Sequence, residues 1–161
     1  MRGHPEVIKL LNKGLAVELT AVNQYLTQSK MCKHQGLHKL ADHFFTDYQD
    51  ERLHAETLID RILFLEGKPD IKVGEQIKLG ETVPQMLEND LKLETGAVDF
   101  YNDVVIACTK HRDAGSREIA EFLLRSSEED VLELENQLKL IKAIGVGNYL
   151  IEQIGEETEN K

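Results

Sequence analysis

Long stretches of helical periodicity dominate this sequence. Apolar residues recur every three or four positions over about residues 5–33, 37–66, 83–112 and 116–144, and a shorter stretch of this kind covers 148–154. This spacing places the apolar side chains on one face of an α-helix. The 161 residues include only 11 Gly and 3 Pro and no Trp, which argues against a turn-rich β sandwich. We therefore predict an all-α protein, organised as a single domain over 1–161.

The connections between these stretches are unequal in length. Those at 34–37 and 113–116 are short, so each joins two antiparallel neighbours, whereas the connection over 67–82 is much longer. A helix of about 28 residues is about 42 Å long, and about 16 extended residues reach about 53 Å. The long connection can therefore return along the whole bundle. We predict a four-helix bundle with one long crossover and a short C-terminal fifth helix. A disordered linker between two separate coiled-coil hairpins is the alternative, and long unstructured loops are uncommon.

Charge and composition limit the partners and the compartment. The formal net charge of −10 at pH 7 argues against a nucleic-acid partner and is compatible with cation attraction. A membrane span is not expected, because no apolar run reaches the roughly 18 residues that a spanning helix requires. The N-terminus lacks the pattern of a signal peptide, which predicts a cytoplasmic protein. Cys32 and Cys108 have no metal-ligand or redox spacing, and we expect two reduced thiols at helical positions.

Each apolar stripe is interrupted by polar residues near its middle. The four interruptions, in chain order, are Glu18, the pair Glu51 and His54, Glu94, and the pair Ser127 and Asp130. An isolated carboxylate in such a core would take up a proton. Several carboxylates and an imidazole at one level can instead be held ionised by a divalent metal, and oxygen-rich sets with imidazole suit iron or manganese, with zinc as a competitor.

The spacing of these residues shows an internal repeat. The interval between Glu18 and Glu51 equals the interval between Glu94 and position 127. The offset that leads from Glu18 to Glu94 therefore predicts a second Glu-x-x-His at 127 and 130, where the sequence has Ser127 and Asp130. Taken singly, a glutamate on such a stripe or a Glu-x-x-His pair is more often part of a solvated helix face. The four matched stripes together predict a metal site, with the ligands Glu18, Glu51, His54, Glu94 and Asp130.

At these residues the chain resembles the bacterioferritins over nearly its full length. The segments that carry the resemblance are MRGHPEVIKLLN (1–12), ELTAVNQY (18–25), RILFLEG (61–67), MLENDLKLE (86–94) and IGVGNYL (144–150). The resemblance implies a ferritin-like fold and a hollow shell of 24 subunits that stores ferric mineral. It also implies a di-iron ferroxidase centre inside each bundle, and it makes the short C-terminal stretch the fifth helix of that family.

The ligand pattern of the family is only partly present. Four of its six ligand positions match, at Glu18, Glu51, His54 and Glu94, whereas Ser127 replaces a bridging glutamate and Asp130 replaces a second histidine. A bridging carboxylate offsets the repulsion between two metal ions. We therefore expect a weak or incomplete ferroxidase, in which the site of Glu18, Glu51 and His54 stays usable and the site of Glu94 is weak. Glu128 could replace the missing carboxylate only if the helix over-winds locally.

The haem site of the family is altered as well. Its ligand is a methionine directly after Glu51, and here that residue is Arg52. Arginine has no lone pair to donate to iron, and Met31 is expected to pack against other apolar groups. We therefore expect no haem through this chain alone. Tyr25 matches a family aromatic and equally suits a core tyrosine, and His4 and His111 are expected to be solvated.

These observations leave four functions to compare. The first is iron storage and detoxification in a shell of one or two subunit types, with ferrous iron as the substrate and room for a reductase partner. The second is a non-catalytic structural subunit that assembles with a catalytic, haem-binding one. The third is a solitary di-metal oxygenase or a rubrerythrin-like peroxidase, and the absence of any C-x-x-C pair argues against the rubredoxin module of the peroxidase. The fourth, a DNA-protecting miniferritin, places its ligands between subunits, and the register within one bundle counts against it.

Overall fold

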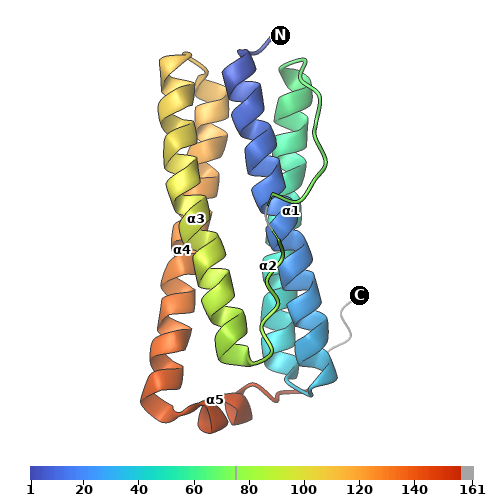
Figure 1. Cartoon of the computed structure of the whole chain (residues 1–161), viewed down its shortest axis with the longest axis vertical. Helices are drawn as coiled ribbons and strands as arrows, with labels where there is room; N and C mark the ends of the chain where they lie inside the picture. The colour runs from blue at the N-terminus through green and yellow to red at the C-terminus, as the bar shows by residue number, and fades with distance from the viewer. Residues whose placement is uncertain (75, 157–161) are drawn as a thin grey trace.

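A computed structural model describes residues 1–74 and 76–156 of the chain. The chain forms five helices (Figure 1), which are α1 (Pro5–His34), α2 (His38–Phe64), α3 (Val83–Lys110), α4 (Ala114–Ile144) and α5 (Val146–Glu152). Within the described residues, no helix combines the length and apolar character that a membrane crossing requires.

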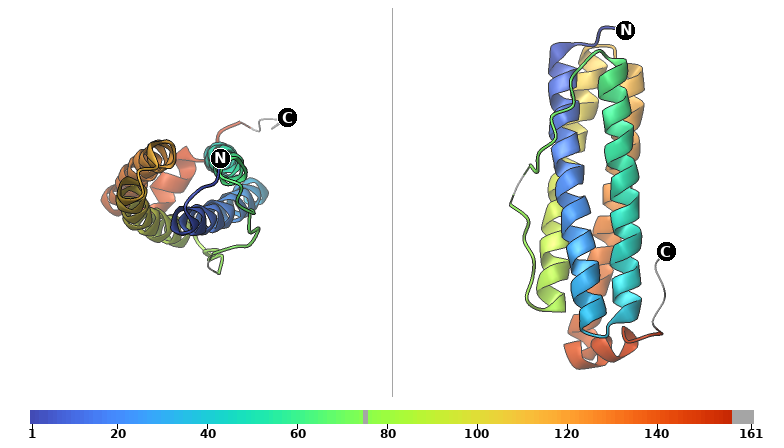
Figure 2. Two further views of the ribbon diagram at one scale, coloured as in Figure 1. Left: turned by 90° about the horizontal axis from the view of Figure 1, so that it is seen from above. Right: turned by 90° about the vertical axis from the view of Figure 1, so that its right-hand side faces the viewer.

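The four long helices form two antiparallel hairpins that lie side by side. Seen from above, α1 and α2 form one pair and α3 and α4 the other (Figure 2). The crossover between the hairpins runs along the length of the bundle, and α5 lies across the end opposite the N-terminus (Figures 1 and 2). The prediction of an all-α four-helix bundle with one long crossover and a fifth helix is confirmed.

Some helices begin or end two residues from their predicted limits, for local reasons. The helix α4 begins at Ala114, two residues before the predicted start, because the Asp113 side chain accepts a hydrogen bond from the backbone N–H of Ser116 and caps the helix. The helix α3 ends at Lys110 rather than 112, and Arg112 has a φ of 55° that a right-handed helix does not accommodate. The fifth helix starts at Val146 instead of 148, directly after Gly145 at φ 83°.

The crossover is fixed to one row of residues on α1. Residues at a four-residue spacing share a helix face, and here Asn12, Ala16, Thr20 and Gln24 bind successive backbone groups of the crossover. The backbone N–H of Gly74 donates to the carbonyl of Ala16 and to the Thr20 hydroxyl, both at 3.1 Å. These bonds satisfy backbone groups along a segment without secondary structure.

The end of the crossover leads to a first prediction, on two glycines. A Cβ added at Gly80 would clash with the backbone nitrogen of Met86 and would lie 2.7 Å from the carbonyl carbon of Gln85, so Gly80→Ala should destabilise the protein by about 2 kcal/mol. The matched control is Gly96→Ala inside α3, where an added Cβ meets nothing within 4 Å, and it should stabilise by up to about 1 kcal/mol. Urea unfolding of both variants checks this, and a Gly80→Ala protein as stable as the parent would contradict it.

The start of α2 is completed by the far end of the chain. The residue before this helix, Leu37, has no side-chain cap. The first-turn donors are instead satisfied by backbone carbonyls beyond α5, since the N–H of His38 donates to Ile154 at 3.0 Å and that of Lys39 to Gln153 at 3.1 Å. The C-terminal segment thus acts as the N-terminal cap of a helix in the other hairpin.

Two apolar clusters fill the bundle, one on each side of a polar layer. One cluster contains the buried apolar residues of α1 up to Leu15, of α2 from Ala55 onward, of α3 from Ala97 onward and of α4 up to Leu123. The other contains those of α1 from Ala21 onward, of α2 up to Phe44 and of α3 up to Leu87, together with Leu134 of α4 and Tyr149 of α5. Both cysteines are buried free thiols, and burial raises the pKa of Cys32 to about 12 and that of Cys108 to about 11. The layer between the clusters contains the polar residues that interrupt the four stripes.

Candidate metal centre

The polar layer consists of side chains from all four long helices. Five of them, each between 3 and 7 % exposed, are Glu18 from α1, Glu51 and His54 from α2, Glu94 from α3 and Ser127 from α4. Asp130 of α4 lies at the edge of the layer and is partly buried. The alternation of three- and four-residue steps keeps these positions on the inward stripe of each helix. The structure therefore brings together every residue that the sequence indicated as a candidate ligand.

The carboxylates and the imidazole form two groups with ligand distances. The His54 Nδ1 lies 3.2 Å from Glu18 Oε2 and 3.1 Å from Glu51 Oε2. One ligand atom from each of Glu18, Glu51 and His54 lies within 4.8 Å of the other two, and the same holds for Glu51, Glu94 and Asp130. Glu51 belongs to both groups, so this carboxylate links them. Carboxylate oxygen with one imidazole is a donor set that suits divalent iron or manganese.

Aromatic residues hold the ligand side chains in place. The Tyr25 hydroxyl donates to Glu94 Oε1 at 2.5 Å, and the Tyr101 hydroxyl donates to Glu18. The rings of Phe122 and His54 pack nearly perpendicular to each other, with 5.5 Å between centroids. Such outer contacts orient ligands and fix their rotamers. Periodicity places Tyr101 on the inward stripe of α3, but nothing in the spacing indicates its bond to Glu18.

Burial gives the layer unusual proton affinities. Desolvation alone would raise the pKa of Glu18, yet hydrogen bonds with Glu51 and His54 outweigh it and hold that pKa below its usual range. Burial, followed by the charge of Glu18, raises the pKa of Glu51 well above its usual value. Burial also raises the pKa of Glu94, and it raises that of Asp130 to about 6. A divalent ion would displace these protons, so metal binding here should weaken as the pH falls.

The second half of the layer lacks a bridging carboxylate. Ser127 occupies that position, and its hydroxyl forms a hydrogen bond with Glu94 that acts to lower the pKa of this carboxyl group. Glu128 is exposed on a continuous α4 and does not replace it. A neutral hydroxyl is a weaker ligand for a hard cation than a carboxylate. The second group of potential ligands therefore consists of Glu51, Glu94 and Asp130, with a neutral hydroxyl at position 127.

Arg52, at the position of the expected haem ligand, and Met31 both contact other residues of the chain. Arg52 follows Glu51 on the exposed side of α2 and forms an ion pair with Glu56 one turn later. Met31, near the end of α1, is partly buried against the apolar cluster next to α5.

A buried aspartate one turn from Glu94 was missed in the sequence. The Asp90 side chain is fully buried, and its Oδ1 accepts hydrogen bonds from Gln24 at 2.7 Å and Gln28 at 2.9 Å. Asp90 Oδ2 and Gln28 Oε1 have no hydrogen-bond partner among the described residues. Burial raises the pKa of Asp90 to about 7. A proton on Oδ2 supplies the missing donor, so the neutral acid suits this position. The four-residue spacing between Asp90 and Glu94 places both on one face of α3, and this feature of the sequence could have indicated Asp90.

A second prediction follows for Asp90. The folded-state pKa of about 7 lies above the ordinary 3.8, so the stabilisation from this carboxyl group is complete below about pH 4 and is lost as the pH rises through 7. The full shift corresponds to about 4 kcal/mol. Asp90→Asn keeps a neutral amide at every pH and should raise the thermal midpoint at pH 8.5 and change it little at pH 5.

The matched control for Asp90 is on the same helix. Asp99 of α3 is exposed, and Asp99→Asn should change the thermal midpoint by a similar small amount at both pH values. Melting of the three proteins followed by circular dichroism makes the comparison. An Asp90→Asn protein that is no more stable than the parent at pH 8.5 would show that ionisation of the buried Asp90 carboxyl group does not destabilise the folded protein.

Comparison with known proteins agrees with the fold. Residues 8–144 match the ferritin-like domain family. The chain is 43 % identical to a bacterial ferritin from Pseudomonas aeruginosa, an alignment that covers 96 % of this chain and 100 % of the relative. It is 41 % identical to a bacterial ferritin from Synechocystis, over 96 % and 99 % of the two chains, and 37 % identical to a bacterioferritin from Mycolicibacterium paratuberculosis, over 92 % and 94 %. The chain belongs to the ferritin-like family.

Proposed function

We propose that the chain stores and detoxifies iron as a subunit of a hollow shell of 24 subunits. The shell would take up Fe(II) in the cytoplasm and hold it as ferric mineral. The names of the relatives support storage of this kind. The observation that carries the proposal is the buried layer in which two ligand groups share Glu51.

In this function Fe(II) is the substrate of the layer. Glu18, Glu51 and His54 would bind the first ion, because they supply two carboxylates and an imidazole from positions already in contact. Glu94 and Asp130, with the second oxygen of Glu51, would bind another ion more weakly. Each Fe(II) gives one electron to oxygen or peroxide, and the carboxylates act as ligands rather than as general bases.

Two substitutions limit this ferroxidase chemistry. Two divalent ions close together repel each other, and carboxylate bridges offset that repulsion. Here Glu51 is the shared carboxylate, and Ser127 is neutral where a second bridge would add charge. Asp130, in place of an imidazole, completes the second group from the edge of the layer. We therefore propose a partial ferroxidase that fills its first site readily and its second only at higher iron concentration.

The alternative function is a structural subunit that relies on a partner for oxidation and haem. It is favoured by Ser127 and Asp130 in the polar layer and by Arg52, which has no lone pair to donate to iron. In this case the shell would contain two subunit types.

The experiment that separates these functions is aerobic addition of Fe(II) to the purified protein. Ferric absorbance and oxygen uptake are followed together, with increasing iron per chain. A rapid phase that saturates at one or two ions per chain supports a working centre. Slow growth that never saturates supports the structural subunit, and the absence of any mineral in a purified assembly would contradict storage by this chain alone.

A further inference from the structure

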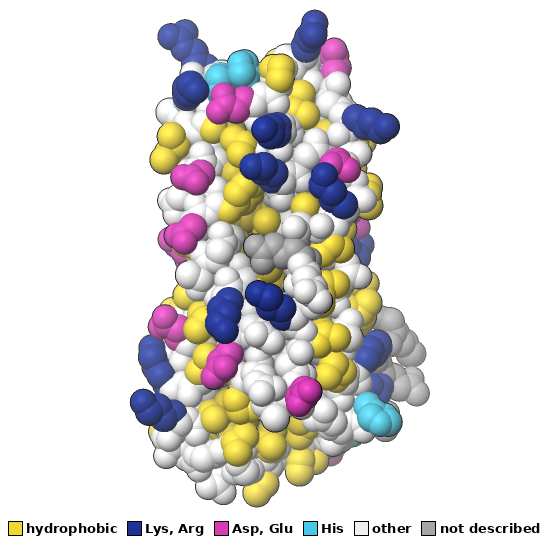
Figure 3. Space-filling model, viewed as in Figure 1, with side chains coloured by type: hydrophobic (Ala, Val, Ile, Leu, Met, Phe, Trp, Pro, Cys, Tyr) yellow, Lys and Arg dark blue, Asp and Glu magenta, His cyan; other side chains and the backbone are white. Residues whose placement is uncertain are grey.

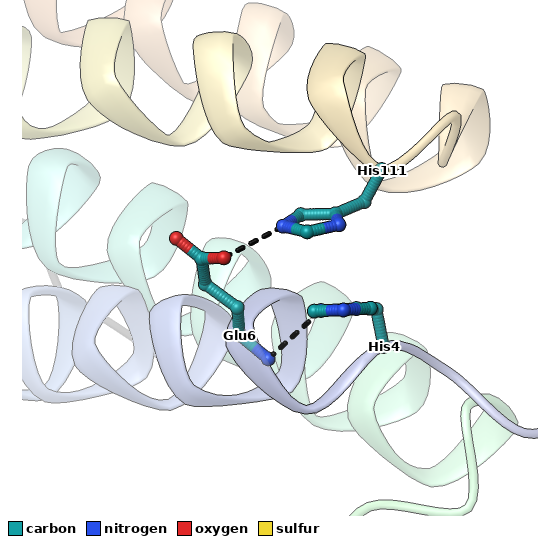
Figure 4. A group of neighbouring side chains, drawn as sticks. All are labelled: His4, Glu6 and His111. Atoms are coloured by element: carbon teal, nitrogen blue, oxygen red, sulfur yellow. Dashed lines mark hydrogen bonds and ion pairs between the residues drawn. The ribbon is translucent and has the colours of Figure 1, made fainter.

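Two histidines and a glutamate meet at the end of the bundle that carries the N-terminus. His4 and Glu6 come from the start of α1, and His111 follows the end of α3, far later in the chain (Figure 4). The His111 Nε2 lies 2.7 Å from Glu6 Oε2, and the two imidazole rings stack with 3.6 Å between centroids. In the space-filling view, histidine side chains lie together beside an acidic one at this end (Figure 3). His4 and His111 were expected to be solvated, whereas the His111 side chain is only 14 % exposed.

The three side chains have the composition of a transition-metal site. One ligand atom from each lies within 4.8 Å of the other two, and two imidazoles with one carboxylate form a set that binds zinc and ferrous iron. With metal–ligand bonds of about 2.1 Å, neighbouring ligand atoms in a tetrahedral site are about 3.4 Å apart. The present 2.7 Å between His111 Nε2 and Glu6 Oε2 therefore has to open by less than about 1 Å.

The helix ends hold two of these residues and leave the third free to adjust. His111 is held by the bond from its backbone N–H to the carbonyl of Ala107, and its side chain is only 14 % exposed. Glu6 lies in the first turn of α1. The His4 ring is exposed and accepts the backbone N–H of Glu6 at Nδ1, so its Nε2 is not used in that bond. A turn of this ring out of the stack directs a nitrogen lone pair toward the other two ligands.

The charges around the group allow a cation. The hydrogen bond from His111, together with the charge of Lys110, lowers the pKa of Glu6, so its carboxylate is ionised and available. The Lys110 Nζ lies 3.6 Å from Glu6 Oε2 and is the competing cation. The Lys110 side chain is 68 % exposed, and it can move into solvent when a metal ion takes its place.

We propose that His4, Glu6 and His111 bind one exchangeable divalent transition-metal ion, with water completing its coordination. This site is separate from the polar layer, because the interval from Glu6 to Glu18 corresponds to about 18 Å along α1. Its exposure permits exchange with solvent, in contrast to the buried layer. The site does not depend on the proposed storage function, since none of its ligands belongs to the central groups.

The test is calorimetric titration of the assembled full-length protein with Zn²⁺ alone. Glu51→Ala is used as the background, because it disrupts both central groups. We expect one zinc ion per chain in this background and at least a 10-fold weaker affinity when His111→Ala is added. The matched control is His34→Ala, an exposed histidine in the last turn of α1, which should leave the affinity unchanged.

A second variant guards against a simple loss of folding. Glu6→Gln keeps the shape and a hydrogen-bonding oxygen but removes the charge, and it should weaken zinc binding by a similar factor with an unchanged thermal midpoint in the absence of zinc. Anomalous diffraction at the zinc edge should place the ion between His4, Glu6 and His111. The proposal would be overturned if His111→Ala and Glu6→Gln, each added to the Glu51→Ala background, bound zinc as tightly as that background does. An anomalous peak elsewhere would also overturn it.

Discussion

Replacing Glu51 with alanine is expected to abolish the rapid phase of Fe(II) oxidation, so that the initial rate of oxidation falls by about 100-fold or more. Glu51 is the one residue present in both ligand groups of the layer, so its loss removes a ligand from each proposed ion. The remaining Glu18 and His54 on one side, and Glu94 and Asp130 on the other, no longer share a carboxylate. Stopped-flow ferric absorbance at low iron per chain measures the effect.

The matched control and a stability measurement make this result specific. Glu56 lies on the same helix, exposed and paired with Arg52, and Glu56→Ala should retain the rapid phase. Because burial and the charge of Glu18 raise the pKa of Glu51, its removal relieves a crowded apo layer, and the metal-free thermal midpoint should not fall greatly. A Glu51→Ala protein that still oxidises iron rapidly would place the oxidation outside this layer.

Restoring the second half of the layer is expected to strengthen iron binding by about 10- to 100-fold. The double variant Ser127→Glu with Asp130→His supplies a carboxylate opposite Glu51 and an imidazole beside Glu94. Asp130→His removes one carboxylate and Ser127→Glu adds one, so the net charge is unchanged, and the gain comes from a carboxylate placed to bridge two ions about 4 Å apart. Iron binding measured per chain should then saturate at two ions in one step, followed by faster oxidation.

The same double variant should respond in opposite directions with and without metal. Without metal, the variant moves a carboxylate from the partly buried position 130 to the buried position 127, beside Glu51 and Glu94 with their raised pKa values, and this lowers the thermal midpoint. With metal, the stronger site raises the midpoint above that of the parent. Ser126→Glu with Asp130→His is the control, because it makes the same change in charge but places the carboxylate one residue away from the inward stripe. Equal midpoints for the two variants in the presence of iron would contradict a bridging role for position 127.

The fold could be predicted well because periodicity and connection length determine it. Apolar residues at three- and four-residue spacing indicated which face of each helix is inside, and the segment 67–82 was long enough to return along the bundle. The same periodicity brought Glu18, Glu51, His54 and Glu94 to one level. Helix ends were less predictable. The helix α4 was expected to begin at about residue 116, and it begins at Ala114 because Asp113 is its N-terminal cap.

Details of the site were not predictable, because they depend on side-chain rotamers and on contacts between distant segments. Periodicity assigns Glu51 to a face, but only its rotamer decides that it belongs to both ligand groups. Asp90 was missed because its partners Gln24 and Gln28 lie on a different helix, much earlier in the chain. The meeting of His4 and His111 depends on how the end of α3 packs beside the start of α1.

The cap that the C-terminal segment provides for α2 also fixes the longitudinal register of the two hairpins. The segment is continuous with α4 through α5, and its carbonyls accept the N–H groups of His38 and Lys39, so it ties the second hairpin to the first, while the crossover is bonded along α1. A slide of one helical turn between the hairpins would be about 5.4 Å, enough to separate Glu94 from Glu51. These two attachments oppose that slide, and the four helices keep their acidic side chains at one height.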